Sequence, residues 1–157
     1  MKFSTREDIA APIDYVFGQV SNFTAFERSA MRRGAEVKRL DTSGKVAPGL
    51  AWEIAFGFRG KPRDVLLELT EYDPEEKMCF EGKSSGLIGV GEVELLALSP
   101  KKTRMRVAIE LKPQTLSARL LVQSLKLAKG NVDKKFQLRV ADYASELGAR
   151  YSMGKTA

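Results

Sequence analysis

The stretch that decides the fold is LSARLLVQSLKLAKGNVDKKFQLRVADYASELGARY, residues 116–151, near the C-terminus. Apolar residues recur in it at steps of three and four, which is the spacing of one stripe along an α-helix. At 1.5 Å per residue the predicted helix is roughly 50 Å long, so it needs a broad apolar partner. Gly130 and Asn131 mark the place where we expect it to kink or divide. The stripe consists of Leu121, Leu125, Ala128, Val132, Phe136, Val140, Tyr143 and Leu147.

The residues before this helix predict the sheet that could supply the partner. Apolar and polar residues alternate in seven segments, as half-buried strands require. The alternation is clearest over residues 50–59, where Leu50, Trp52, Ile54, Phe56 and Phe58 share one face. The predicted strands cover residues 2–9, 36–41, 50–59, 63–72, 77–83, 88–98 and 103–112, with a loop over residues 42–49.

Two short helices are expected between the first and second strands. Pro12 suits the first turn of a helix, where its missing N–H has no cost. Thr24 and Glu27 have capping-box spacing, which predicts that a second helix starts there and runs to about Met31. Elsewhere, Gly89 and Gly91 within one strand predict a bulge or a close approach of backbone.

This order of elements predicts an α+β fold. Short turns join the last six strands into an antiparallel meander, and a seven-stranded sheet of this kind curls strongly. The long helix is the one element able to cover the concave face. Because a helix and a curled sheet touch along a stripe, space between them is either an open pocket or is filled by aromatic side chains. We expect one domain over residues 1–151 and a flexible tail over residues 152–157.

The composition narrows the function classes. The chain has 157 residues, a net charge of +6, one cysteine and no histidine. The absence of histidine removes the Ser-His and Cys-His nucleophile pairs and most zinc sites, so we expect neither a metal nor a cofactor. Residues 1–12 show no signal peptide and no apolar run reaches 18 residues, so we expect a cytoplasmic protein. The basic charge favours an anionic partner, although a solvated basic surface explains it equally well.

The chain resembles the START-like superfamily, also called SRPBCC. Four features carry the resemblance: Ile9-Ala10-Ala11-Pro12 leading into Val16-Phe17, Pro48-Gly49 before the Trp52 strand, Leu69-Thr70-Glu71-Tyr72-Asp73-Pro74 at a hairpin end, and the long terminal helix. The superfamily includes polyketide cyclases/dehydrases, lipid-transfer domains and birch-pollen-allergen-like proteins. The resemblance implies a helix-grip fold and a hydrophobic cavity between sheet and helix that holds a lipid, fatty acid, quinone or polyketide-like molecule. Fold likeness alone does not choose among these.

The alternation and the resemblance together give a set of candidate ligand-binding residues. The apolar set expected to line the cavity is Trp52, Ile54, Phe56, Phe58, Leu67, Leu69, Met78, Phe80, Met105, Val107, Leu121, Leu125, Val132, Phe136 and Tyr143. Alternate turns of a meander lie at the same end of the sheet. In the proteins that this chain resembles, that end is the mouth of the cavity. We expect a basic rim there, made of Arg32, Arg33, Arg59, Lys61 and Arg63, which would orient a ligand with an anionic head. Basic turns that only keep the sheet edges soluble are the alternative.

Support for catalysis is thinner than support for binding. Most glutamates within the strands fall opposite the apolar face and are expected to be solvated. Glu71 follows Val65, Leu67 and Leu69 in register and is the best candidate for a carboxyl with a raised pKa inside the cavity, although it is the last such position, where strands often surface. Tyr143 could donate a hydrogen bond, and Cys79 has no histidine to activate it. We expect reversible binding or transport, with a polyketide-cyclase-like enzyme as the alternative.

The basic charge bears on two macromolecular partners, nucleic acid and a membrane surface. The aromatic residues follow the apolar alternation rather than interleaving with the cations, so no nucleic acid is expected. A transient contact of the basic helix face with a membrane surface is expected, because lipid carriers load from bilayers.

Overall fold

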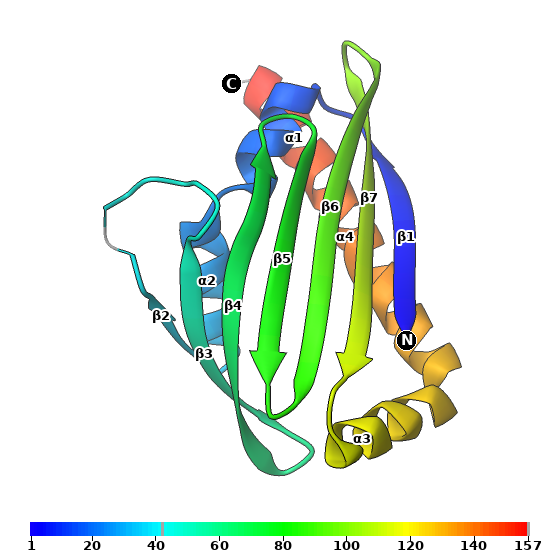
Figure 1. Ribbon diagram of the computed structural model, residues 1–157. Coiled ribbons are helices and arrows are strands. Elements are labelled where there is room, and N and C mark those ends of the chain that lie inside the picture. Colours follow the sequence, from blue (N-terminus) through cyan, green and yellow to red (C-terminus); the bar gives the residue numbers. More distant parts are fainter. Residues whose placement is uncertain (42, 157) are drawn as a thin grey trace.

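The computed structural model describes residues 1–41 and 43–156, without the side chains of residues 155 and 156. Thr42 of the predicted loop and Ala157 of the predicted tail lie outside the described residues. One seven-stranded antiparallel sheet has the order β1-β7-β6-β5-β4-β3-β2 (Figure 1). Its strands are β1 (Lys2–Ile9), β2 (Glu36–Arg39), β3 (Ala51–Phe58), β4 (Lys61–Asp73), β5 (Lys77–Ser84), β6 (Leu87–Ser99) and β7 (Lys102–Pro113).

The strand register sorts the side chains onto two faces. Trp52 lies opposite Leu67, which lies opposite Gly82, and this row continues through Gly89 to Leu111. The neighbouring row runs through Glu53, Leu66, Lys83 and Ile88 on the other face. Since successive side chains of a strand point to opposite faces, the first row belongs to the concave face and the second to the outer face.

The four helices within the described residues lie on the concave side of the sheet or at its lower end. Helices α1 (Ile13–Val20), α2 (Phe23–Arg32) and α4 (Lys129–Thr156) lie behind the sheet in Figure 1, and α3 (Leu116–Leu127) lies at its lower end. The architecture is the predicted curved sheet around a C-terminal helix. Its core gathers residues from α1, α4 and the strands, among them Val16, Leu69 and Leu147.

The start of α2 differs from the prediction. Asn22 is the N-cap, and its side-chain oxygen accepts a hydrogen bond from the backbone N–H of Ala25 at 3.2 Å. Thr24 therefore lies inside the first turn and caps nothing. Glu27, the other half of the predicted capping box, instead binds side chains of β2 and β3. A carboxylate with two tertiary donors is not free to reach back to the helix start.

The predicted long helix divides in two. Its break is at Ala128, the C-cap of α3, which has φ −106° and ψ 19°. The break precedes the expected position at Gly130, which lies in the first turn of α4. Every residue of the predicted stripe from Leu121 to Leu147 is nevertheless half-buried or buried. Helix α4 runs on to Thr156, past the point where the sequence predicts a tail to begin.

Within residues 1–41 and 43–156, the helices are too short or too polar to cross a bilayer.

Candidate functional site

One half of the concave face is filled by side chains. Leu69, Met78, Met105 and Leu147 are each at most 2% exposed, and Ala144 of α4 packs with them. This tightly packed half lies beneath α1 and the C-terminal part of α4. Leu69, Met78 and Met105 belong to the predicted ligand-binding set, and here they are core residues.

Trp52 is also part of this packed region. It is 4% exposed, and its ring meets Phe23 edge to face with the centroids 5.2 Å apart. Its indole N–H donates to Glu27 Oε2 at 2.7 Å, and Arg39 Nε donates to the same oxygen at 2.7 Å. Burial opposes ionisation of Glu27, but the hydrogen bonds from Arg39 and Trp52 outweigh it and hold the pKa of Glu27 below its usual value. Trp52 of β3, a predicted cavity residue, is thus held against α2.

The other half of the concave face is not filled in this way. Phe56 and Phe58 of β3 are 36% and 37% exposed, although both follow Trp52 on the concave face. Further apolar side chains there are half-buried rather than buried. They include Ile54, Val65, Leu67, Phe80, Leu87, Val107, Ile109, Leu111, Leu121, Leu125, Val132 and Phe136. We call this region, from Phe56 and Phe80 to α3 and the start of α4, the open half.

The middle of the concave face carries no side chains at three adjacent positions. Gly82 lies opposite Gly89, and Gly91 lies opposite Phe80. All three glycines are partly exposed. A Cβ placed on Gly91 would have Phe80 Cβ, at 4.0 Å, as its nearest neighbour, which is ordinary contact. We call Gly82, Gly89 and Gly91 the glycine floor.

Neither the bulge nor the close approach of backbone that was predicted at Gly89 and Gly91 is present. β6 pairs with β5 and β7 without a register shift at these positions, so there is no bulge. A Cβ on Gly89 would meet only the Leu111 side chain, at 3.6 Å, so no backbone approaches closely. Alternate glycines at positions 89 and 91 were the sequence signal for the floor. Gly82 was missed because it becomes their neighbour only through pairing of β5 with β6.

The predicted mouth is built from two tight turns and the start of α3. Arg59 and Gly60 join β3 to β4, and Ser85 and Gly86 join β5 to β6, all with positive φ. Arg59 Nη1 donates to the Ser124 hydroxyl of α3. The backbone N–H of Gln114 donates to the Gly86 carbonyl at 2.7 Å. These bonds bring both turns and α3 to one end of the sheet (Figure 1).

The rim cations lie close to this end. A shallow hollow of about 480 Å³ is lined by Gly34, Phe56, Lys61 and Arg63, among others, which brings the residue after Arg33 beside the β3–β4 turn. Arg32, Arg33 and Lys61 are exposed. Arg63 Nε is buried without a hydrogen-bond partner among the described residues, and Arg63 lies opposite Phe56 in the pairing of β3 with β4. The rim is therefore a loose group of cations rather than a closed ring.

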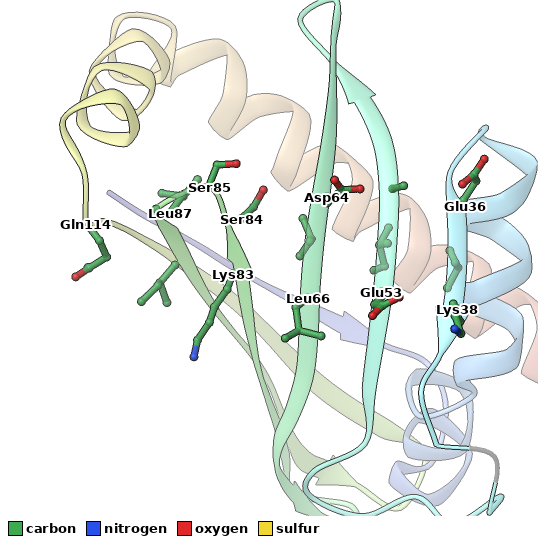
Figure 2. A pocket seen from close by; sticks show the side chains of 16 residues that line it. Glu36, Lys38, Glu53, Asp64, Leu66, Lys83, Ser84, Ser85, Leu87 and Gln114 are labelled. Carbon is green, nitrogen blue, oxygen red and sulfur yellow. The ribbon is translucent and has the colours of Figure 1, made fainter.

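A second hollow, larger than the one beside the rim, lies on the outer face. It has a volume of about 800 Å³ and spans strands β2 to β6 near the mouth (Figure 2). The outer-face row of Glu53, Leu66, Lys83 and Ile88 lines it, and Lys83 and Leu66 point away from α3 and α4 in Figure 2. Of the predicted ligand-binding residues, it includes Ile54 alone. Charged side chains of both signs line it, among them Lys38, Glu53 and Lys83, which suits an apolar ligand poorly.

The predicted position of Glu71 inside the cavity is wrong. A register shift between Leu69 and Glu71 turns Tyr72 to the concave face and Glu71 to the outer face. There the Cys79 thiol donates to Glu71 at 3.4 Å and Lys77 lies 3.6 Å away. The hydrogen bond from Cys79 and the Lys77 charge hold the pKa of Glu71 below its ordinary value. Burial, with Glu71 beside it, raises the pKa of Cys79 to about 11, which keeps the thiol protonated near neutral pH.

Tyr143 lies away from the open half. Its ring packs 5.9 Å from Phe26 of α2, and burial raises its pKa to about 12. The described residues contain no group of three or more acidic or cysteine side chains placed to hold a metal ion.

A scan against protein-family models and a search of curated protein sequences both give no match. Solved structures do match. Norcoclaurine synthase from Thalictrum flavum, a point mutant bound to a transition-state analogue, is 12% identical with a TM-score of 0.66, covering 97% of this chain and 96% of that one. This chain has the START-like helix-grip fold. The ZhuI aromatase/cyclase from a Streptomyces species is also 12% identical, with a TM-score of 0.62 over 85% of this chain and 88% of that one.

A third START-like neighbour is a superfamily protein from Mycobacterium smegmatis. It is 11% identical with a TM-score of 0.57, covering 85% of this chain and 95% of that one. At such identities the likeness concerns the fold, and the chemistry of this chain has to come from its own residues.

Proposed function

We propose that this protein binds and carries a hydrophobic or amphipathic small molecule in the open half, between the sheet and the C-terminal helices. The supporting observation is the glycine floor, with partly exposed apolar side chains around it. A packed core does not leave concave-face phenylalanines such as Phe56 and Phe58 more than one-third exposed. A lipid, fatty acid, quinone or polyketide-like ligand would cover them.

Apolar contact supplies most of the affinity in this proposal. Covering about ten methylenes would contribute roughly 8 kcal/mol before the costs of association, at about 0.8 kcal/mol per CH₂. The exposed rim cations, being solvated, would add about 1 kcal/mol each or less. Their main effect would be to orient an anionic head at the mouth. A transient contact with a membrane surface is the proposed route of loading.

A cyclase-like enzyme has less support. It would need polar groups held deep against the ligand, and the carboxylate predicted for this role, Glu71, faces outward. Similarity to a solved aromatase/cyclase supports the fold and carries no residue across.

The test compares laurate with dodecanol, which share an apolar body and differ in the head group. Both should bind the wild-type protein, displace a fluorescent fatty-acid probe and be recovered unchanged by mass spectrometry. Lys61→Glu combined with Arg33→Glu should weaken laurate several-fold and leave dodecanol unaffected. Lys101→Glu with Lys102→Glu, at the opposite end, is the matched control. Binding of neither ligand would refute the carrier proposal, and a chemically altered ligand would favour the enzyme.

A further inference from the structure

Helix α3 has two apolar faces, and only one of them is covered. Ala118 and Val122 are buried, and Leu121 and Leu125 are half-buried. On the opposite side Leu116, Leu120 and Leu127 are 74%, 58% and 93% exposed. At 3.6 residues per turn the two groups lie roughly half a turn apart. We call Leu116, Leu120 and Leu127 the leucine stripe.

The leucine stripe lies in a segment that carries only positive charge. Residues 113–132 contain no aspartate or glutamate, and their cations are Arg119, Lys126 and Lys129. All three cations are exposed, and none forms an ion pair within the described residues. Arg119 and Lys126 are seven residues apart, so they share one flank of the stripe. Ser117 and Ser124, also seven apart, occupy the other.

The position of α3 adds a third observation. The helix projects at the lower end of the sheet in Figure 1, beside the β3–β4 and β5–β6 turns, and the Arg59 side chain reaches Ser124. Thr115 caps its start by accepting from the backbone N–H of Ala118 at 3.2 Å. The break at Ala128 lets α3 leave the axis of α4. The exposed leucines therefore stand on a formed helix at the mouth end.

We propose that α3 is an interfacial helix that docks this protein on an anionic lipid bilayer. Leucines along one side and cations on their flank are the composition of helices that lie in the headgroup region. Protein interfaces are instead depleted in lysine and enriched in aromatic residues, which the stripe lacks. Each cation near an anionic surface strengthens binding about fivefold. Docking in this way turns the mouth of the open half toward the lipid, whatever the ligand is.

The test is flotation of the full-length chain with two kinds of vesicle, phosphatidylcholine alone and phosphatidylcholine mixed with phosphatidylserine. Wild-type protein should float with the mixed vesicles at low salt and much less at high salt. Leu120→Glu/Leu127→Glu should reduce partitioning at least about tenfold. Arg119→Glu/Lys126→Glu should remove the preference for phosphatidylserine. Leu96→Glu/Lys101→Glu, exposed at the opposite end of the sheet, should bind as the wild type does.

A second measurement keeps the test independent of folding defects. In Leu127→Trp, the new indole should emit as in water and shift to shorter wavelength with mixed vesicles, while buried Trp52 gives a constant background. Failure of wild-type protein to float with the mixed vesicles would overturn the proposal. So would equal flotation of the leucine double variant. A wild-type dimer that the same variant dissociates would show that a second copy covers the stripe, which also overturns it.

Discussion

Replacing Gly91 with leucine distinguishes an open concave face from a filled one, because the two cases predict changes of opposite sign in the free energy of unfolding. A Cβ at this position meets nothing closer than Phe80 Cβ at 4.0 Å, and the larger side chain would extend over the glycine floor. Removing a glycine from a strand gains roughly 0.5–1 kcal/mol. Each methylene covered by the apolar walls adds about 0.8 kcal/mol. We therefore expect Gly91→Leu to raise the free energy of unfolding by about 1–2 kcal/mol. In a filled core the same change would overpack and cost about 1–3 kcal/mol.

The same substitution should abolish much of the ligand binding. A leucine side chain occupies the room of three or four ligand methylenes, so laurate should lose about 2–3 kcal/mol, or roughly 30- to 200-fold in affinity. Urea unfolding followed by circular dichroism gives the stability, and displacement of a fluorescent fatty acid gives the affinity. Ala108→Leu, on the outer face of β7, is the matched control and should leave the affinity unchanged. A destabilised Gly91→Leu protein with unchanged laurate affinity would refute the reasoning.

Three further predictions concern single side chains. Asn22→Ala should lower the free energy of unfolding by about 1 kcal/mol through loss of the α2 cap, whereas Thr24→Ala should change it little, as urea midpoints will show. Glu27→Ala leaves two donors without their acceptor and should cost about 1–3 kcal/mol at neutral pH. The pKa of Glu27 in the folded protein is below its ordinary value, so the stability that its carboxylate contributes is fully present at pH values above the ordinary pKa. It is lost as the pH falls through the pKa of the folded protein, so the urea midpoints of variant and wild type should converge in acid. Cys79, with a pKa of about 11, should react with a disulfide reagent at pH 8 about 100-fold more slowly than a free thiol, and Glu71→Gln should speed the reaction.

The seven strands and the meander of the last six could be predicted because each strand carries its own pattern, whereas the pairing of β1 with β7 was not predicted. Alternation over residues 50–59 places Trp52 and Ile54 on one face whatever the partner strand is, and the short turns leave no other pairing than a meander. The helical stripe from Leu121 to Leu147 likewise faces the protein on both sides of the break at Ala128.

The positions that escaped prediction depend on contacts between distant segments. The register shift after Leu69 reverses the face of Glu71, and nothing in the local sequence marks it. Glu27 is held by Arg39 and Trp52, contacts that need β2 and β3 in place, so it does not form the capping box that its spacing from Thr24 indicates. The outer hollow and the glycine floor arise from coiling and pairing of several strands. The assignment of ligand contacts to particular side chains stays a prediction.

Methyl-resolved NMR tests the central claim most directly, because neighbouring residues report on opposite faces of one sheet. Leu67 and Ile109 lie on the concave face, whereas Leu66 and Ile88 lie in the outer-face row. When laurate is added to the wild-type protein, we predict large shifts for the Leu67 and Ile109 methyl groups and small ones for Leu66 and Ile88. Shifts confined to Leu66 and Ile88 would place the ligand in the outer hollow and contradict the proposed site between sheet and helix.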